Sequence, residues 1–193
     1  TLTLYDFSLK GSKPFEKEIL VSSKELALGI NLKSVFSKKI SISKIFVSEG
    51  NINVKVNEQG EPNYNVYKSN STQIKNPADT ASASLKLEHI QIDRTNLLYD
   101  DKSIPISIEA KGLNYSGRGD LSQAIFDLAS NIKIDSFDLD YNHSHYIGSK
   151  KLKAKLVTKI NTNSLSFIFE KNELVLNRLP FQFNGKFFFE RSI

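Results

Sequence analysis

Cysteine is absent from the 193-residue sequence. Its absence excludes disulfide bonds, thiolate metal sites and cysteine nucleophiles. Long apolar runs are absent too, because no stretch approaches the roughly 18 consecutive apolar residues that a membrane-spanning helix needs. No signal peptide is recognisable. The first residues, Leu2–Leu4, read as the interior of a strand, and the run Phe187–Phe189 stands close to the end. We therefore expect the sequence to be part of a longer chain.

A block of basic residues is also missing, although the net charge is +5. Lysines and arginines are spread along the chain, and nothing resembles a recognition helix, a glycine-rich phosphate loop or a zinc-finger spacing. A basic chain can be attracted to anionic lipid or nucleic acid, or it can carry a lysine-rich, soluble surface. The even spread favours the second interpretation, and we expect no nucleic-acid partner.

What the sequence does contain is alternation of apolar and polar residues with period two, the pattern of half-buried strands. β-branched and aromatic residues are frequent in these runs. The pattern predicts an all-β-dominated fold, an elongated and strongly curved antiparallel sheet. Helix is expected only at residues 31–37, where Asn31 can cap a short turn that carries Leu32, Val35 and Phe36.

Three segments align on one another and indicate an internal repeat. They are "IFVSEGNINV" from Ile45, "IQIDRTNLLY" from Ile90 and "IKIDSFDLDY" from Ile132. In each, two apolar residues two positions apart lead through a polar residue and a short junction into an alternating return. We interpret each segment as a β-hairpin, so that repeated hairpins build a meander.

The chain divides at a polar stretch. Residues 1–68 are predicted to be an N-terminal β-segment, residues 69–84 a flexible linker, and residues 85–193 a repeated β-hairpin segment that continues the same sheet. Before the linker, Gly60 permits the positive φ of a tight turn and Pro62 stops strand pairing. A nearby asparagine, Asn63 or Asn65, is expected to bond local backbone as the chain leaves the sheet.

A sheet of this kind has one apolar face, and a second layer, curling or a ligand must cover it. Two interpretations of the apolar strand positions remain open: core packing of a β-sandwich, or a groove that shelters acyl chains. Acyl chains need only a continuous apolar surface, since each buried CH₂ contributes roughly 0.8 kcal/mol. The candidate lipid-contacting residues are Ile90, Ile92, Ile106, Ile108, Ile132, Ile134, Phe167 and Phe169.

Residues with catalytic chemistry form no convincing set. Asp100 and Asp101 are neighbours in a strand and point to opposite faces, so they favour a turn with backbone hydrogen bonds over an acid/base pair. The pair His143 and His145 would need one or two further ligands for a zinc site. Asp138, Asp140 and His89 are available in the sequence, but nothing in it places them beside the pair, so a turn with solvated histidines is favoured. A glycosidase would require paired carboxylates that the sequence does not provide. We expect no catalytic residue, no metal and no cofactor, and therefore no enzyme.

Four stretches resemble the N-terminal part of the AsmA-like proteins of Gram-negative envelopes, especially those of Bacteroidota. The early strand, the strand–helix–strand passage, the glycine–asparagine turn and the last strands match in order and spacing. The stretches are Leu4–Gly11 ("LYDFSLKG"), Leu26–Ile45 ("LALGINLKSVFSKKISISKI"), Asn57–Asn65 ("NEQGEPNYN") and residues 176–190 ("LNRLPFQFNGKFFFE").

The resemblance implies an elongated, groove-forming β-protein, similar to TamB and to chorein-like bridge proteins. It implies a periplasmic location, an N-terminal membrane-anchoring helix that would precede Thr1, and transfer of phospholipid between membranes in support of the outer membrane. The tripeptide Asp79-Thr80-Ala81 resembles an O-glycosylation site of Bacteroidota envelope proteins, at Thr80. The alternative function is a β-rich binding module or chaperone that captures strands of outer-membrane proteins by β-augmentation.

Overall fold

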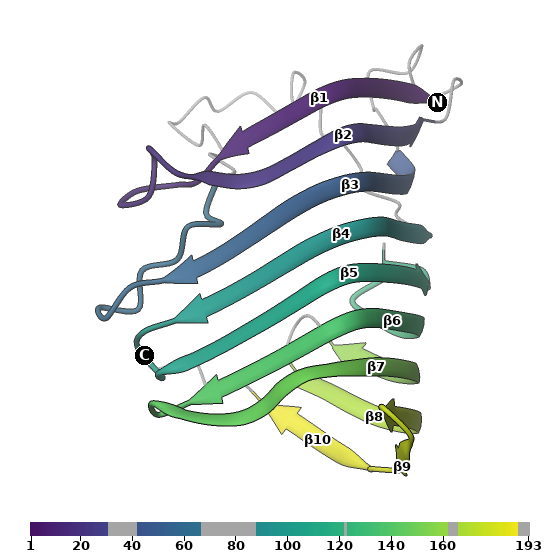
Figure 1. Cartoon of the computed structure of the whole chain (residues 1–193). Coiled ribbons are helices and arrows are strands. Elements are labelled where there is room, and N and C mark those ends of the chain that lie inside the picture. Colours follow the sequence, from purple (N-terminus) through teal and green to yellow (C-terminus); the bar gives the residue numbers. More distant parts are fainter. Residues whose placement is uncertain (31–41, 67–87, 122, 162–165, 189–193) are drawn as a thin grey trace.

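The structure, a computed structural model, describes residues 1–30, 42–66, 88–121, 123–161 and 166–188. The predicted helix at 31–37, the predicted linker at 69–84 and Thr80 lie outside these residues. The described residues form ten strands and no helix (Figure 1). The strands are β1 (Leu2–Lys10), β2 (Ile19–Ile30), β3 (Ile42–Val56), β4 (His89–Asp101), β5 (Ile106–Arg118), β6 (Ile125–Tyr141), β7 (Ser144–Asn161), β8 (Ser166–Leu176), β9 (Leu179–Phe181) and β10 (Gly185–Phe188). The all-β prediction is confirmed.

All ten strands belong to one open sheet, in the order β1-β2-β3-β4-β5-β6-β7-β8-β10, and β9 pairs with the opposite end of β8. Every pair is antiparallel except β3 and β4, which are parallel. The prediction of a purely antiparallel sheet is therefore wrong at this one junction. A parallel pair needs a crossover connection of about a dozen residues or more, and residues 57–88 are long enough to provide it.

The internal repeat is visible in the register of the parallel pair. Ile45 lies opposite Ile90, and every β3–β4 partner keeps the same sequence offset as this pair. The aligned residues of two repeats are therefore direct neighbours in the sheet. The hairpin interpretation is wrong, however, because each of the three segments runs through one continuous strand, β3, β4 or β6.

The positions that the sequence analysis predicts as hairpin junctions are irregularities inside long strands. Glu49 in β3 and Arg94 in β4 have positive φ angles of 50° and 43°, and Gly112 in β5 and Ser149 in β7 have 64° and 50°. The β6–β7 register shifts after Ile134. Such bulges bend a strand and increase its twist, so a line of them across neighbouring strands bends the whole sheet.

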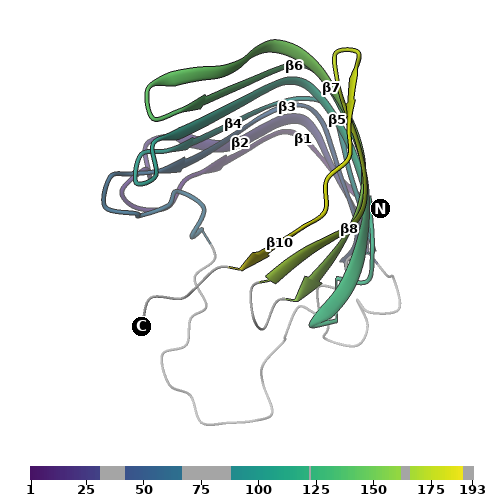
Figure 2. The same ribbon diagram turned by 90° about the horizontal axis from the view of Figure 1, so that it is seen from below.

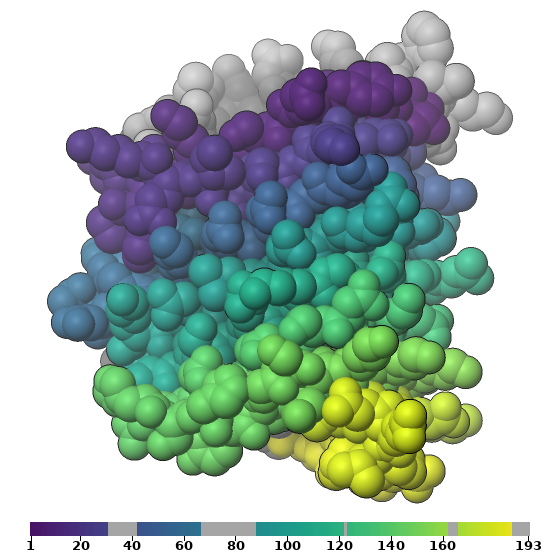
Figure 3. Space-filling model, viewed as in Figure 1, coloured from purple at the N-terminus to yellow at the C-terminus, as the bar shows by residue number. Residues whose placement is uncertain are grey.

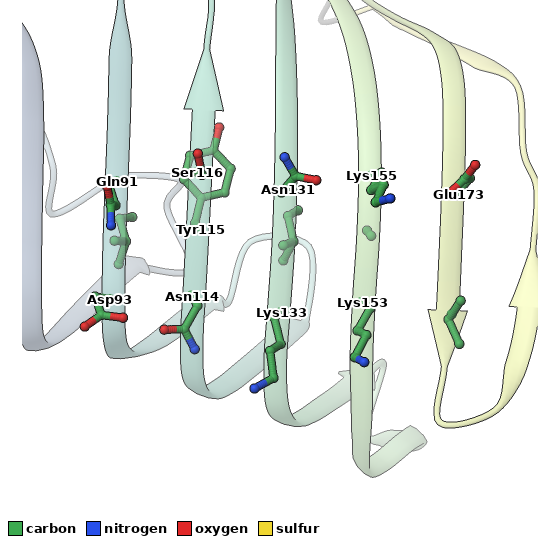
Figure 4. A pocket seen from close by; sticks show the side chains of 14 residues that line it. Gln91, Asp93, Asn114, Tyr115, Ser116, Asn131, Lys133, Lys153, Lys155 and Glu173 are labelled. Atoms are coloured by element: carbon green, nitrogen blue, oxygen red, sulfur yellow. The ribbon is translucent and has the colours of Figure 1, made fainter.

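Figure 2 shows this bend in side view: the long strands turn together and give the sheet a convex and a concave side. The close view in Figure 4 shows the ribbons turning just beyond Asp93, Asn114, Lys133 and Lys153, next to the bulges. Figure 3 shows the convex side of the molecule in the orientation of Figure 1.

The best-buried row of residues lies at the bend. Thr95 is 0% exposed, Leu113 and Ile134 are 7% exposed, and Leu152 is 9% exposed. Leu113, Ile134 and Leu152 belong to the apolar cluster that includes Ala110 and Ala154. A single layer buries a row this well only on the inside of a bend, where its two halves fold toward each other. The apolar core therefore lies on the concave face.

The turn after β3 matches the sequence prediction. Gly60 has a φ of 79°, and Pro62 makes only an isolated bridge to Val56. Asn63 is 1% exposed, its Oδ1 accepts from the Lys55 N–H at 3.0 Å, and its Nδ2 donates to the Asn53 carbonyl at 2.6 Å. The buried amide thus replaces ladder hydrogen bonds at the point where the chain leaves the sheet.

The close approach of β2 and β3 at the bend gives a first prediction. A Cβ added to Gly50 would lie 2.5 Å from the Ser22 carbonyl oxygen, whereas a Cβ on Gly185 would meet nothing within 4 Å. Because a backbone atom cannot move aside cheaply, Gly50→Ala should lower the free energy of unfolding by about 1–3 kcal/mol. Gly185→Ala should change it by less than about 0.5 kcal/mol. Urea unfolding measures both, and equal effects would contradict the close strand approach.

Candidate functional site: the apolar concave face

The concave face is defined by the strand register. Side chains alternate between the two faces of a strand, and Cα partners on neighbouring strands share a face. The buried Ala154 belongs to a row of paired residues that crosses the sheet and consists of apolar side chains and one tyrosine. This central row is Leu4, Leu26, Val47, Ile92, Tyr115, Ile132, Ala154 and Leu174, one residue from each of β1 to β8.

The neighbouring rows on the same face are mostly apolar as well. On one side of the bend, the row begins with Ile45 and Ile90, continues through Gly117 and Leu156, and includes the polar residues Ser130 and Asn172. On the other side, one row runs Val21, Ile52, Leu97, Ala110 and Phe137, and the next runs Val54, Tyr99, Ile108, Leu139 and Ile147.

All eight sequence-predicted candidates lie on this one face. The register puts Ile90, Ile92, Ile106, Ile108, Ile132, Ile134, Phe167 and Phe169 there. Ile134 is buried at the bend, and the other seven are half-buried. The structure brings them together as members of one surface, and whether they contact lipid stays a prediction.

The candidates predicted from the sequence include no residue of β1, β2 or β3, although these three strands also contribute side chains to this surface. Leu26, Val47 and Ile52 continue the same rows, and their period-two alternation was visible in the sequence. What was not visible is that β3 and β4 are neighbours, since their parallel pairing depends on a long connection.

Some polar side chains on this face are hydrogen-bonded locally, whereas the buried Ser23 Oγ and Asn172 Oδ1 have no partner among the described residues. The Tyr115 hydroxyl lies 3.1 Å from Ser130 Oγ. It occupies the space above Gly117, where an added Cβ would lie 2.4 Å from it. Asn172 Nδ2 donates to the Phe183 carbonyl at 2.8 Å, which ties the connection between β9 and β10 to β8.

Asp101 is the last residue of β4, and its side chain lies on the concave face. It is 7% exposed, and its Oδ1 accepts from Ser103 N–H at 2.9 Å and from Ile104 N–H at 3.3 Å. Its Oδ2 accepts from the Tyr99 hydroxyl at 2.9 Å. Burial works to raise the pKa of Asp101, but the hydrogen bonds from Ser103, Tyr99 and Ile104 outweigh it and lower that pKa. Burial and the neighbouring Asp101 raise the pKa of Tyr99 to about 12.

The predicted turn with backbone hydrogen bonds is confirmed for Asp101. Asp101 holds the β4–β5 turn through backbone hydrogen bonds, and Asp100 is its neighbour along an extended strand. His145 Nδ1 lies 2.6 Å from Asp140 Oδ1 at the exposed β6–β7 hairpin. Among the described residues, no group of three or more potential ligands could hold a metal ion.

The outer, convex face is polar. Glu49 pairs with Lys24 and with Arg94, at 3.0 Å to the arginine, and Asn96 Nδ2 donates to Asn51 Oδ1 at 3.1 Å. The arginine and lysine beside Glu49 lower the pKa of its carboxyl, chiefly through the hydrogen bond from Lys24. A shallow hollow of about 460 Å³ lies on the outer face over β4 to β8 (Figure 4).

In comparisons with known proteins, no protein-family model, no curated protein and no solved structure matches this chain. In the part of the chain that the structure describes, no helix is long and apolar enough to cross a bilayer.

Asp101 gives a second prediction, through pH. Its folded-state pKa lies below the ordinary 3.8, so its contribution to stability is complete above that value and is lost as pH falls through the folded pKa. At pH 7, Asp101→Asn should lower the free energy of unfolding by about 1–3 kcal/mol. The difference from wild type should hold down to about pH 5 and shrink below about pH 4.

Asp100→Asn is the matched control, because no hydrogen bond to the Asp100 carboxylate is found among the described residues. Denaturant unfolding from pH 7 to pH 3 measures all three proteins. A pH-independent loss in Asp101→Asn would contradict the assigned hydrogen bonds.

Proposed function

We propose that this chain is a non-enzymatic part of an intermembrane phospholipid-transfer bridge, with the concave face as a groove for acyl chains. The observation that carries the proposal is the central apolar row, which crosses eight strands with the Tyr115 hydroxyl, hydrogen-bonded to Ser130, as its one side-chain polar group. Among the described residues, all strands belong to one sheet, so no second sheet packs against this face to make a β-sandwich core.

The size of the row suits hydrocarbon. With strands about 4.8 Å apart, the seven intervals between β1 and β8 span about 34 Å. One leaflet contributes about half of the roughly 30 Å hydrocarbon core of a bilayer, so the row is about twice as long as one leaflet's acyl layer. Half-buried residues such as Ile92 and Ile132 leave apolar surface to cover, and each CH₂ buried there contributes roughly 0.8 kcal/mol.

The repetition of apolar rows along the sheet also suits a ligand that moves along the face without a fixed binding position. Acyl chains make no directional contacts, so a face that offers the same apolar surface on every strand holds them without fixing a single position. The resemblance to AsmA-like proteins adds the setting: a periplasmic bridge held to a membrane by a helix that precedes Thr1, in support of the outer membrane.

A second function is favoured by one observation, the open edge of the sheet at β1. In the described residues β1 pairs only with β2, and Leu2, Leu4 and Tyr5 are exposed there. Such an edge can add a strand from another chain. This supports a chaperone for outer-membrane proteins, in which the partner would bind at β1 and the concave face would remain without lipid.

A third prediction separates the two functions with a photo-crosslinking amino acid, placed in turn at Ile108 and Ser107 of the protein expressed in its native envelope. Ile108 lies on the concave face and its neighbour Ser107 on the outer face. We expect about tenfold more phospholipid adduct, by mass spectrometry, from position 108 than from position 107, because acyl chains reach only the apolar side.

Equal lipid yields at both positions would contradict the groove. Protein adducts from a third probe position at Thr3 in β1, with no lipid adduct at 108, would instead support strand capture at the open edge.

A further inference from the structure

The outer face carries a second feature that lipid transport does not use, the hollow of about 460 Å³ over β4 to β8. Two rows of outward side chains border it, and the backbone between the rows forms its floor. Apart from Tyr115, which belongs to the central row of the concave face, the labelled residues in Figure 4 belong to these two outward rows. One row is Gln91, Ser116, Asn131, Lys155 and Glu173, and the other is Asp93, Asn114, Lys133, Lys153 and Val175.

Positive charge gathers at the β6–β7 part of the hollow. Lys133 and Lys153 are direct cross-strand partners, an arrangement that destabilises a sheet through like-charge repulsion. Lys133 reaches Asp135 only at 3.9 Å, and neither Lys153 nor Lys155 has an ion-pair partner among the described residues. An anion between these ammonium groups would remove the repulsion.

The rest of the hollow is lined by amide and hydroxyl groups, by Val175 and by the carboxylates of Glu173 and Asp93, of which Asp93 is paired with Arg94 at 3.1 Å. Within the described chain, the side chains of Gln91, Ser116 and Asn131 make no hydrogen bond, so their amide and hydroxyl groups are free to bind a ligand. Asn114 is already engaged with Arg94 N–H and the Gly112 carbonyl.

The hollow continues into a neighbour of about 220 Å³, which shares Asn131, Lys155 and Glu173 and adds Lys171. The binding surface is therefore elongated along the sheet. Between β4 and β8 it extends for about 19 Å at a strand spacing of about 4.8 Å, and its two rows stand about 7 Å apart.

From these features we propose that the outer hollow binds an acidic oligosaccharide, a sugar chain that carries carboxylate or phosphate groups. Sugar hydroxyls match the free amides and the hydroxyl of the first row, acid groups match the lysine pair through charge-assisted hydrogen bonds, and the lysine stems and Val175 provide apolar contact for the C–H faces of the rings. The hollow lies over the middle of the sheet, where an extended peptide finds no free strand edge to pair with. Ile92, Tyr115, Ile132 and Ala154 of the central row also line the hollow, but the proposal uses only the outward side chains and does not depend on lipid on the concave face.

The test is calorimetric titration of the purified chain with hexagalacturonate, and with neutral maltohexaose as the uncharged comparison. We expect saturable binding of hexagalacturonate only, and about tenfold weaker binding in the double variant Lys133→Gln/Lys153→Gln, which removes two charge-assisted contacts. The variant Lys13→Gln/Lys102→Gln carries the same change in net charge at exposed sites elsewhere and should bind like wild type.

Folding does not limit the test, since removing the Lys133–Lys153 repulsion should leave the thermal midpoint unchanged or higher. Absence of hexagalacturonate binding would overturn the proposal, and so would an equal loss in both double variants, which would indicate unspecific charge attraction. A third overturning result is binding confined to vesicles with 30% phosphatidylglycerol, which would make this face a membrane-docking surface.

Discussion

The constraint that shapes this molecule is the need to cover the apolar face of a very wide sheet. A ten-stranded layer with one apolar side cannot leave that side in water. In the described residues, the sheet covers part of its apolar face by bending toward that side. Bulges at Glu49, Arg94, Gly112 and Ser149 stand on neighbouring strands, and the residues on the inside of the bend, from Thr95 to Leu152, become the best-buried part of the protein. Other residues of the concave face, such as Ile92 and Ile132, are only half-buried.

The internal repeat explains how the rows of the face stay continuous. β3 and β4 are parallel copies whose equivalent residues lie opposite each other, so the apolar positions and the polar junction of one copy match those of the next. The junction residues Glu49 and Arg94 then meet as an ion pair at the outer side of the bend. A repeat that stacks in this way can extend an apolar face strand by strand without changing its chemistry.

The sequence predicts the strands and the shared face well, because alternation with period two is a local signal. Ile90, Ile92, Ile132 and Ile134 were assigned to one face on this basis, and the register agrees. The turn at Gly60 and Asn63 was also predicted, since positive φ and local amide hydrogen bonds are properties of those residue types. The junctions at Glu49 and Arg94 were not, because a polar residue in the left-handed region suits a bulge as well as a hairpin turn.

Other features lie beyond local pattern altogether. The parallel contact of β3 with β4 depends on which segments meet after a long connection. The outer hollow with Lys133 and Lys153 depends on the β6–β7 register, because a shift of one residue would move both lysines to the other face. The two faces thus carry different chemistry, apolar and continuous on the concave side, polar and locally basic on the outer side.

The central claim is that the concave face holds hydrocarbon. A crystal structure of the protein purified from its native membranes without detergent tests it most directly. Elongated, unbranched density lying against Ile90, Ile92 and Ile132 is the expected result. Contradiction would come from a concave face closed by the protein's own side chains, or from ordered water along these residues.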